Sequence, residues 1–247
     1  MGKLDNKVAI ITGGNAGVGK EIAKLFASEG AKVVISARRQ QVLEEAAKEI
    51  EAAGGTVLCV PTDISKVDDV KNLVSKTVET FGQLDILINN AGVLDKGLNA
   101  IDQIDYDDLN RVIDINQKGT MYCMSEALKV MKSGASIVNI SSVAGQYGAG
   151  GAVYVSTKAA IIGVTKHAAM RFAKEKIRCN VICPGSITTD MAAGLTPDTM
   201  GAMSAHSDLT LQPCSPLDVA KVALFLASDD AAPLTGQVVV SDYGVDL

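Results

Sequence analysis

The stretch from Val8 to Gly19 reads VAIITGGNAGVG and leads into a segment whose apolar residues recur at helical spacing. Its first five residues are apolar or β-branched, which is typical of a buried strand. Glycines after such a strand let the backbone turn tightly and approach a phosphate, and the free N–H groups that open the next helix favour an anion. The stretch therefore predicts a strand, a phosphate-binding turn and a helix, although a plain connecting loop has similar local chemistry.

The same alternation of short β-branched runs and longer amphipathic segments continues to the end of the chain. It predicts strands at 8–12, 33–36, 57–60, 86–89, 136–140, 178–182 and 238–241. It predicts helices at about 18–29, 40–53, 66–81, 107–131, 153–174 and 216–228. Such a pattern is typical of βαβ units and a parallel sheet. We expect one α/β domain over residues 1–247, a Rossmann-type doubly wound sheet of mostly parallel strands with helices on both faces.

Composition limits the kinds of partner and compartment. Of 247 residues, 47% are hydrophobic and 21% are charged, and the net charge of −5 comes from acids and bases mixed along the chain. No basic face is indicated, so nucleic acid is not expected as a partner. No apolar run is long enough for a membrane span, and the N-terminus lacks the layout of a signal peptide. We expect a cytoplasmic protein with no membrane partner.

The cysteines and histidines indicate neither disulfides nor a metal site. The five cysteines are scattered, and Cys179 and Cys183 would lie roughly 13 Å apart along a strand, too far for a disulfide. They are interpreted as small core residues in a reducing compartment. The two histidines, His167 and His206, have no cysteine or carboxylate at ligand spacing, so no metal is expected.

A tyrosine and a lysine four residues apart, Tyr154 and Lys158, share one face of a predicted helix. A nearby cation favours the phenolate and lowers the pKa of a tyrosine, so the phenol can both give and take a proton. Reduction of a ketone needs such a group, because hydride addition to carbon leaves charge on oxygen. Ser142 or its neighbour Ser141, across a glycine-rich loop, is placed to hydrogen-bond the same oxygen. An ordinary surface helix is the alternative for the pair taken alone.

These motifs, in this order, resemble the classical short-chain dehydrogenase/reductase family over essentially the whole chain. The spacing Thr12-Gly13-x-x-x-Gly17-x-Gly19 is similar to that family's cofactor signature TGxxxGxG. Further matches are Asp63, the run Asn89-Asn90-Ala91-Gly92, Asn116, Ser142, Tyr154, Lys158, Pro184-Gly185, Thr189 and Met191. The resemblance implies a catalytic set of Asn116, Ser142, Tyr154 and Lys158. It selects Ser142 over Ser141, because the family's serine is followed by two residues and a glycine.

The resemblance also implies which residues bind a nicotinamide cofactor. These are Gly13, Asn15, Gly17, Val18, Gly19, Arg38, Asp63, Ile64, Asn90, Tyr154, Lys158, Pro184, Gly185, Ile187 and Thr189. NAD sites usually place an acid at the end of the second strand, whereas an arginine accommodates the 2′-phosphate of NADP. Here Ala37 is followed by Arg38, so NADP is favoured over NAD; Ala16, where NADP-dependent members often carry a basic residue, keeps NAD open.

Asn116 falls inside the long predicted helix of 107–131. Asparagine competes for backbone hydrogen bonds, so its position indicates a local break in that helix. By resemblance it marks a kink that holds a water linked to the active-site lysine. Family members are usually tetramers built through the helices that correspond to 107–131 and 153–174, and we expect a homotetramer.

Two segments are expected to shape the substrate site. The loop Gln146–Val153 includes Tyr147, which is interpreted either as substrate-facing or as loop surface. Residues 186–213 lack clear periodicity and follow the nicotinamide motif, so they resemble the family's substrate lid. Their Met191, Leu195, Met200 and Met203 suit a hydrophobic substrate, or else dock the lid on the core.

The sequence thus predicts reversible hydride transfer between NADP(H) or NAD(H) and a small hydrophobic ketone or secondary alcohol, such as a hydroxysteroid. A 3-oxoacyl thioester is an alternative substrate. A nucleotide-sensing regulator without catalysis is the alternative of another class, but it would be expected to lack Tyr154 or Lys158.

Overall fold

A computed structural model describes residues 2–187, 196, 199, 201, 207, 208 and 210–245. Its centre is a seven-stranded sheet in the order β3-β2-β1-β4-β5-β6-β7, with every neighbouring pair parallel. The strands are β1 Val8–Thr12, β2 Lys32–Ala37, β3 Thr56–Pro61, β4 Ile86–Asn89, β5 Ser136–Ile140, β6 Arg178–Pro184 and β7 Val238–Ser241. The predicted doubly wound sheet is confirmed. β2 and β3 are each one residue longer at both ends than expected, and β6 is two residues longer at its C-terminal end.

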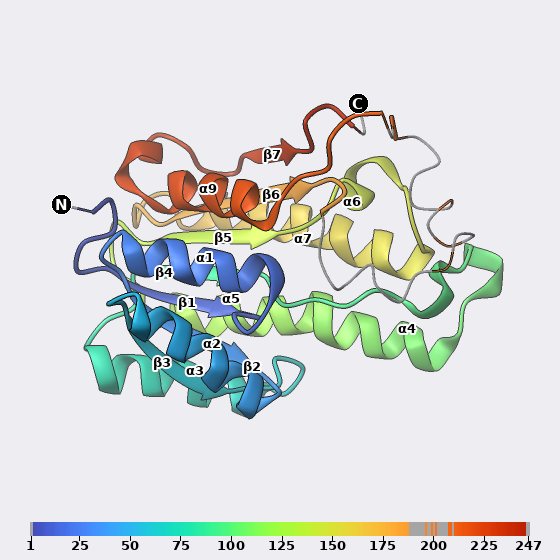
Figure 1. The fold of residues 1–247 in the computed structure, drawn as a ribbon. Coiled ribbons are helices and arrows are strands. Elements are labelled where there is room, and N and C mark those ends of the chain that lie inside the picture. Colours follow the sequence, from blue (N-terminus) through green and yellow to red (C-terminus); the bar gives the residue numbers. More distant parts are fainter. Residues whose placement is uncertain are drawn as a thin grey trace.

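Helices cover both faces of the sheet (Figure 1). They are α1 Gly17–Ser28, α2 Gln40–Ala52, α3 Val67–Phe81, α4 Tyr106–Val112, α5 Thr120–Leu128, α6 Ala144–Tyr147, α7 Ala152–Arg171 and α9 Pro216–Ala227. Single turns of 3₁₀-helix occur at η1 Lys96–Leu98, η2 Ile101–Gln103 and η5 Asp229–Ala231. Between α4 and α5 the chain forms a π-helix, η3 Ile113–Gly119.

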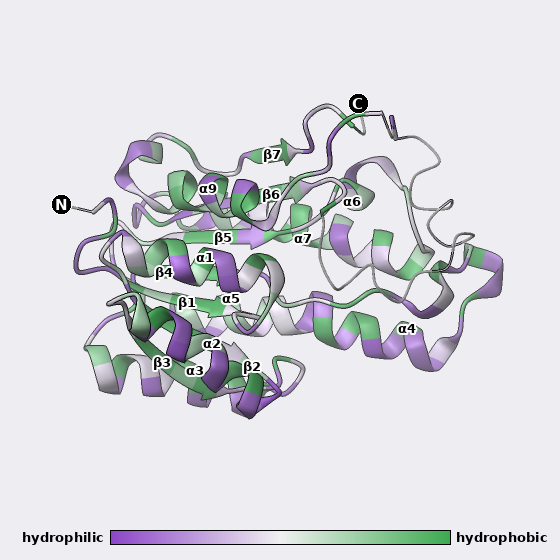
Figure 2. Cartoon of the chain, in the orientation of Figure 1, coloured by the Kyte–Doolittle hydropathy of each residue, from purple (hydrophilic) through white to green (hydrophobic). Residues whose placement is uncertain are grey.

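Two large hydrophobic clusters fill the space between the sheet and its helices, and a small third one joins Ile161, Val181 and Cys183. One cluster packs residues of α1, α2 and α9, which lie in front of the sheet in Figure 1, and the other packs residues of α3, α5 and α7 behind it. Figure 2 shows the strands as mostly hydrophobic and α1, α2 and α4 with hydrophilic bands. Because both faces are covered, the central strands read as continuous apolar runs rather than alternating ones.

The structure confirms one expectation about the helices and corrects another. The predicted helix 107–131 is divided by the π-helix that contains Asn116, which confirms the local break expected there. Part of the loop expected before Val153 is a short helix, α6, which packs on α7 through Gly145. A Cβ on Gly145 would lie 2.5 Å from the backbone of Lys158, so this close approach needs glycine.

Three further observations concern the cysteines, candidate metal ligands and helix length. All five cysteines are free, including Cys179 and Cys183 on β6. Among the described residues, no group of histidine, cysteine and carboxylate side chains is arranged to hold a metal ion. Within the same part of the chain, no helix combines the length and the apolar character needed to cross a membrane.

Arg178 joins the sheet to the end of α9. Its guanidinium is buried and donates to the backbone oxygens of Leu226 at 2.6 Å, Ala227 at 3.2 Å and Ser228 at 3.0 Å. The last carbonyl groups of a helix have no partner within the helix, and burial would leave them unsatisfied.

We expect Arg178→Met to lower the free energy of unfolding by about 2–4 kcal/mol, because buried carbonyl groups would lose their donors. Chemical denaturation measures this loss. Arg171→Met, which removes an exposed arginine at the end of α7, is the matched control and should change stability little. Equal effects of the two substitutions would contradict a capping role for Arg178.

Candidate active site

The glycine turn after β1 is folded tightly against its neighbours. Gly13 has a φ of 68°, and its N–H donates to the Ser36 oxygen at 2.7 Å. A Cβ on Gly19 would lie 2.3 Å from the Gly13 oxygen and 2.4 Å from Nδ2 of Asn90. Asn90 Nδ2 in turn donates to the Thr12 oxygen at 3.0 Å. Gly13, Gly19 and Asn90 therefore form one cradle in which larger residues do not fit.

The N-terminus of α1 begins beside this cradle, and neither its N-cap nor its first turn supplies an acidic side chain. The residue before the helix, Ala16, has no side-chain cap, and the first turn, which includes Val18, contains no acidic residue. Arg38 is exposed at the end of the neighbouring strand β2. Backbone N–H groups and a guanidinium both favour anions, so this corner suits the phosphates of a nucleotide.

Asp63 and Ile64 lie at the carboxyl end of β3. Asp63 Oδ1 accepts from the backbone and the hydroxyl of Ser65, at 3.1 and 2.7 Å. Ile64 is buried against Gly119 of the π-helix, where a Cβ would lie 2.8 Å from its side chain. The turn after β3 is thus fixed against the π-helix. The expected contact of Asp63 and Ile64 with adenine stays a prediction.

The segment after β6 is described only in part. Pro184 ends β6, Gly185 donates to the Ser241 oxygen at 3.1 Å, and Ile187 bridges to Cys214. Thr189 and the apolar residues Met191, Leu195, Met200 and Met203 lie outside the described residues, as do most positions of the expected lid over 186–213. Their assigned contacts with the nicotinamide and the substrate stay predictions.

Ser142, not Ser141, has its hydroxyl beside Tyr154. Ser141 is buried and donates to the Lys158 backbone oxygen at 2.7 Å, which occupies its hydroxyl. Ser142 Oγ accepts from Ala144 N at 3.1 Å. Burial raises the pKa of Tyr154, and the nearby Ser142 hydroxyl opposes that rise. The hydroxyl and the phenol are therefore neighbours, and the catalytic role of Ser142 stays a prediction.

Tyr154 and Lys158 are both buried, with exposed fractions of 7% and 6%. Lys158 Nζ lies 5.5 Å from the centre of the Tyr154 ring and donates to the Ile140 oxygen at 2.9 Å. Burial raises the pKa of Tyr154 to about 12 and lowers the pKa of Lys158 to about 8. Burial is the largest cause of the raised Tyr154 pKa, and the expected lowering of that pKa by Lys158 stays a prediction.

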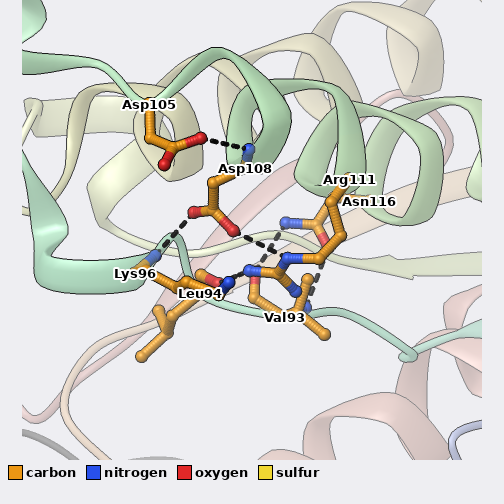
Figure 3. A network of polar contacts seen from close by, with 7 residues as sticks. All are labelled: Val93, Leu94, Lys96, Asp105, Asp108, Arg111 and Asn116. Atoms are coloured by element: carbon orange, nitrogen blue, oxygen red, sulfur yellow. Dashed lines mark hydrogen bonds and ion pairs between the residues drawn. The ribbon is translucent and has the colours of Figure 1, made fainter.

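Asn116 fixes the segment that leaves β4. Its amide oxygen accepts from Val93 N at 2.8 Å, and its Nδ2 donates to the Val93 oxygen at 2.9 Å (Figure 3). Nδ2 also donates to Thr157 Oγ1 at 3.2 Å. A Cβ on Gly92 would lie 3.3 Å from Asn116 Oδ1 and 3.5 Å from Lys158 Nζ. The π-helix thus brings Asn116 beside Lys158 across Gly92.

A second pair of side chains, which the sequence did not single out, holds the same segment. Asp108 accepts from Lys96 N at 2.6 Å and from Arg111 Nε at 2.7 Å, and Arg111 donates to the Leu94 oxygen at 2.8 Å (Figure 3). Burial alone would raise the pKa of Asp108, but these donors outweigh it and lower the pKa. The i,i+3 spacing of Asp108 and Arg111 was the only signal in the sequence, and it is common on helix surfaces.

The geometry brings Asn116, Ser142, Tyr154 and Lys158 together beside the glycine cradle, at the carboxyl ends of the strands. A buried phenol next to a hydroxyl can hold a carbonyl oxygen and transfer a proton to it. The cradle and the uncapped α1 N-terminus fit a phosphate-bearing cofactor within reach of that point.

Comparisons with known proteins show which proteins the whole chain is similar to. A family model described as enoyl-(acyl carrier protein) reductase matches residues 13–246. The chain is 34% identical over 248 residues to 3beta-hydroxysteroid dehydrogenase 2 of Eggerthella lenta, covering 98% of this chain and 95% of that protein. It is 36% identical over 246 residues to a 3-oxoacyl-(acyl-carrier-protein) reductase of Thermotoga maritima, covering 98% and 99%.

A solved structure is also similar over nearly its whole length. A short chain dehydrogenase from Burkholderia cenocepacia J2315 in complex with NADP superposes with a TM-score of 0.89 at 30% identity. The match covers 98% of each chain.

Proposed function

Because the chain belongs to the classical short-chain dehydrogenase/reductase family and is an oxidoreductase, we propose that it transfers hydride reversibly between a nicotinamide cofactor and a small hydrophobic ketone or secondary alcohol. The observation that carries this proposal is the buried pair of Tyr154 and Lys158, with Nζ 5.5 Å from the ring centre and the Ser142 hydroxyl close to the phenol. A non-catalytic nucleotide sensor has no need of such a buried proton donor.

Tyr154 acts as the general acid in reduction and as the general base in oxidation. With its pKa raised to about 12, the phenol keeps its proton at neutral pH and can donate it to a carbonyl oxygen. Ser142 holds the same oxygen, and the pair stabilises the charge that hydride addition creates. When bound, the oxidised cofactor supplies a hydride acceptor whose positive ring also favours the phenolate needed for oxidation.

Lys158 and Asn116 support Tyr154. The pKa of Lys158 is lowered to about 8, so the ammonium still predominates at neutral pH and can hold a ribose hydroxyl. Asn116 bonds Val93 and Thr157 and lies close to Lys158 across Gly92, which suits a part in a proton relay. The water expected at the Asn116 kink, linked to Lys158, is part of this proposed relay.

The residues around the cradle would hold the cofactor. Gly13, Asn15, Gly17, Val18, Gly19 and Asn90 would surround its phosphates, Asp63 and Ile64 its adenine, and Pro184, Gly185, Ile187 and Thr189 its nicotinamide. The steric limits at Gly13 and Gly19 fit this assignment, because a close-packed backbone leaves N–H groups free to approach an anion.

NADP is the proposed cofactor, with NAD as the alternative. Arg38 is exposed at the end of β2, where a guanidinium can bind a 2′-phosphate in a forked geometry. The similar Burkholderia protein was solved with NADP. Titration of the protein with NADPH and NADH, followed by nicotinamide fluorescence, tests the preference directly.

We expect Arg38→Gln to weaken NADPH binding about 10- to 100-fold and to leave NADH binding nearly unchanged, because only NADPH carries the 2′-phosphate. Arg39→Gln removes the adjacent exposed arginine and serves as the control. A preference for NADH in the unmodified protein, or an equal loss for both cofactors, would contradict the role given to Arg38.

The proposed substrate is a free hydrophobic molecule such as a hydroxysteroid, which the name of the Eggerthella relative also describes. A 3-oxoacyl thioester is the second candidate, because the Thermotoga relative is named for that reaction. Residues 133–157 contain no lysine or arginine to dock an acidic carrier protein, which favours the first. Parallel assays with a 3β-hydroxysteroid and a 3-oxoacyl thioester distinguish them.

A homotetramer in the cytoplasm completes the proposal. Met121 on α5 and Met170 on α7 are exposed by 45% and 72%, which is consistent with contact surfaces on these two helices. Light scattering after size-exclusion chromatography measures the assembly, and a monomer would overturn this part.

A further inference from the structure

Asp95 is a buried carboxylate next to the helix that carries Tyr154. It is 5% exposed, and its Oδ1 has no hydrogen-bond partner among the described residues. Its oxygens face Gly151, where a Cβ would lie 2.2 Å from Oδ2 and 2.5 Å from Oδ1. Gly151 is the N-cap of α7, so the carboxylate lies directly against the start of this helix.

The first turn of α7 lacks a negative group of its own. Its N-cap offers no side chain, and the turn contains no acidic residue. Ala152 N donates to the Asn99 oxygen, while the N–H groups of Val153 and Tyr154 interact with the Asp95 carboxylate and favour its charged form. A carboxylate at a helix N-terminus satisfies free N–H groups and interacts favourably with the helix dipole.

The backbone on both sides of Asp95 is held in place. Val93 is bonded twice by Asn116, the Leu94 oxygen accepts from Arg111, and Lys96 N donates to Asp108 (Figure 3). These contacts fix three of the four residues from Val93 to Lys96, and Asp95 is the one whose side chain points to α7 instead. A braced segment is able to hold the helix that it touches.

We propose that Asp95 is a positioning residue for Tyr154. The Asp95 carboxylate fixes the first turn of α7 and opposes loss of the proton from the Tyr154 phenol. The inference rests on the proposed role of Tyr154 as proton donor and acceptor. It assigns to Asp95 no contact with the reacting atoms.

The groups that face these two residues support an electrostatic link. Burial is the largest cause of the raised pKa of Tyr154. The nearby Ser142 hydroxyl lowers this pKa, whereas Asp95 and Cys183 raise it further. Lys158 lies over the tyrosine ring. Burial raises the pKa of Asp95 itself, Asp108 adds to that rise, and the amides of Val153 and Tyr154 oppose it.

A double-mutant cycle in thermal stability tests the contact without any turnover. Gly151→Ala should lower Tm by about 3–8 °C, because the new Cβ meets the Asp95 oxygens. In an Asp95→Ala background the same substitution should cost almost nothing, since the space is open. Additive losses would overturn the proposed contact. If Asp95→Ala does not fold, an unchanged Tm and kcat in Gly151→Ala alone would overturn it equally.

The pH profile of alcohol oxidation by the cofactor-bound enzyme tests the electrostatic part. Asp95→Asn keeps the shape of the side chain and removes its charge, which lowers the pKa of the Tyr154 phenol. The rising limb of kcat against pH should therefore move to lower pH, and kcat for oxidation at neutral pH should rise by roughly tenfold. Asp102→Asn removes an exposed charge from the same connection and should leave the limb in place. An unmoved limb in Asp95→Asn would overturn this part of the proposal.

These outcomes separate the inference from the proposed function. An active Tyr154→Phe variant would remove the function but leave the stability cycle between Asp95 and Gly151 intact. The inference alone would fail if Tyr154→Phe is inactive, the stability losses of Asp95→Ala and Gly151→Ala add, and the pH limb of Asp95→Asn does not move.

Discussion

Tyr154→Phe is expected to lower kcat by roughly 10²–10⁴-fold or more, because the substitution removes the phenolic proton that the proposed mechanism transfers to the carbonyl oxygen. The ring remains, so packing around Lys158 and the α7 helix should persist. Cofactor affinity should therefore change little. Steady-state kinetics and a fluorescence titration with NADPH measure the two quantities on the same preparation.

Tyr106→Phe is the matched control for this substitution, because it removes a phenolic hydroxyl that is 77% exposed on α4. It should retain full activity. Substantial turnover by Tyr154→Phe, under conditions where the control is unchanged, would exclude Tyr154 as the proton donor. Loss of both activity and cofactor binding would instead indicate a structural role for the hydroxyl.

Gly19→Ala is expected to weaken cofactor binding by about 10- to 100-fold, because its Cβ would lie 2.3 Å from the Gly13 oxygen and 2.4 Å from Asn90 Nδ2. Both neighbours belong to the cradle: the first is a backbone oxygen, and Asn90 Nδ2 is held by its hydrogen bond to the Thr12 oxygen. Relief of the clash must move the glycine turn away from the geometry that leaves its N–H groups free for a phosphate. Titration with the reduced cofactor measures the loss.

Gly163→Ala provides the control for a helical glycine, because a Cβ at this exposed position on α7 meets nothing within 4 Å. It should keep cofactor affinity and raise the free energy of unfolding by about 0.5–1 kcal/mol, through the better helix propensity of alanine. Unchanged cofactor binding in Gly19→Ala would show that the cradle tolerates a side chain and would undercut the assigned site.

Much of the fold was predictable because it depends on local patterns. The β-branched runs and the glycine turn after Val8–Thr12 identified all seven strands and their parallel arrangement. The break at Asn116 was also predictable, since a polar residue that competes for backbone hydrogen bonds stood inside an otherwise regular pattern. The short α6 helix was not, because four residues, one of them Gly145, carry too little periodicity to distinguish a turn of helix from a loop.

The sequence by itself determined the order of strands and helices, the glycine spacing and the four-residue separation of Tyr154 from Lys158, since all three follow from local backbone geometry. Only the tertiary structure decided that Ser141 is occupied by the Lys158 oxygen and that Asp95 lies against Gly151. It also decided the direction of the Tyr154 pKa, which burial raises although a lysine is near. Burial and contacts between distant segments depend on how every element packs around the site, and no local pattern specifies them.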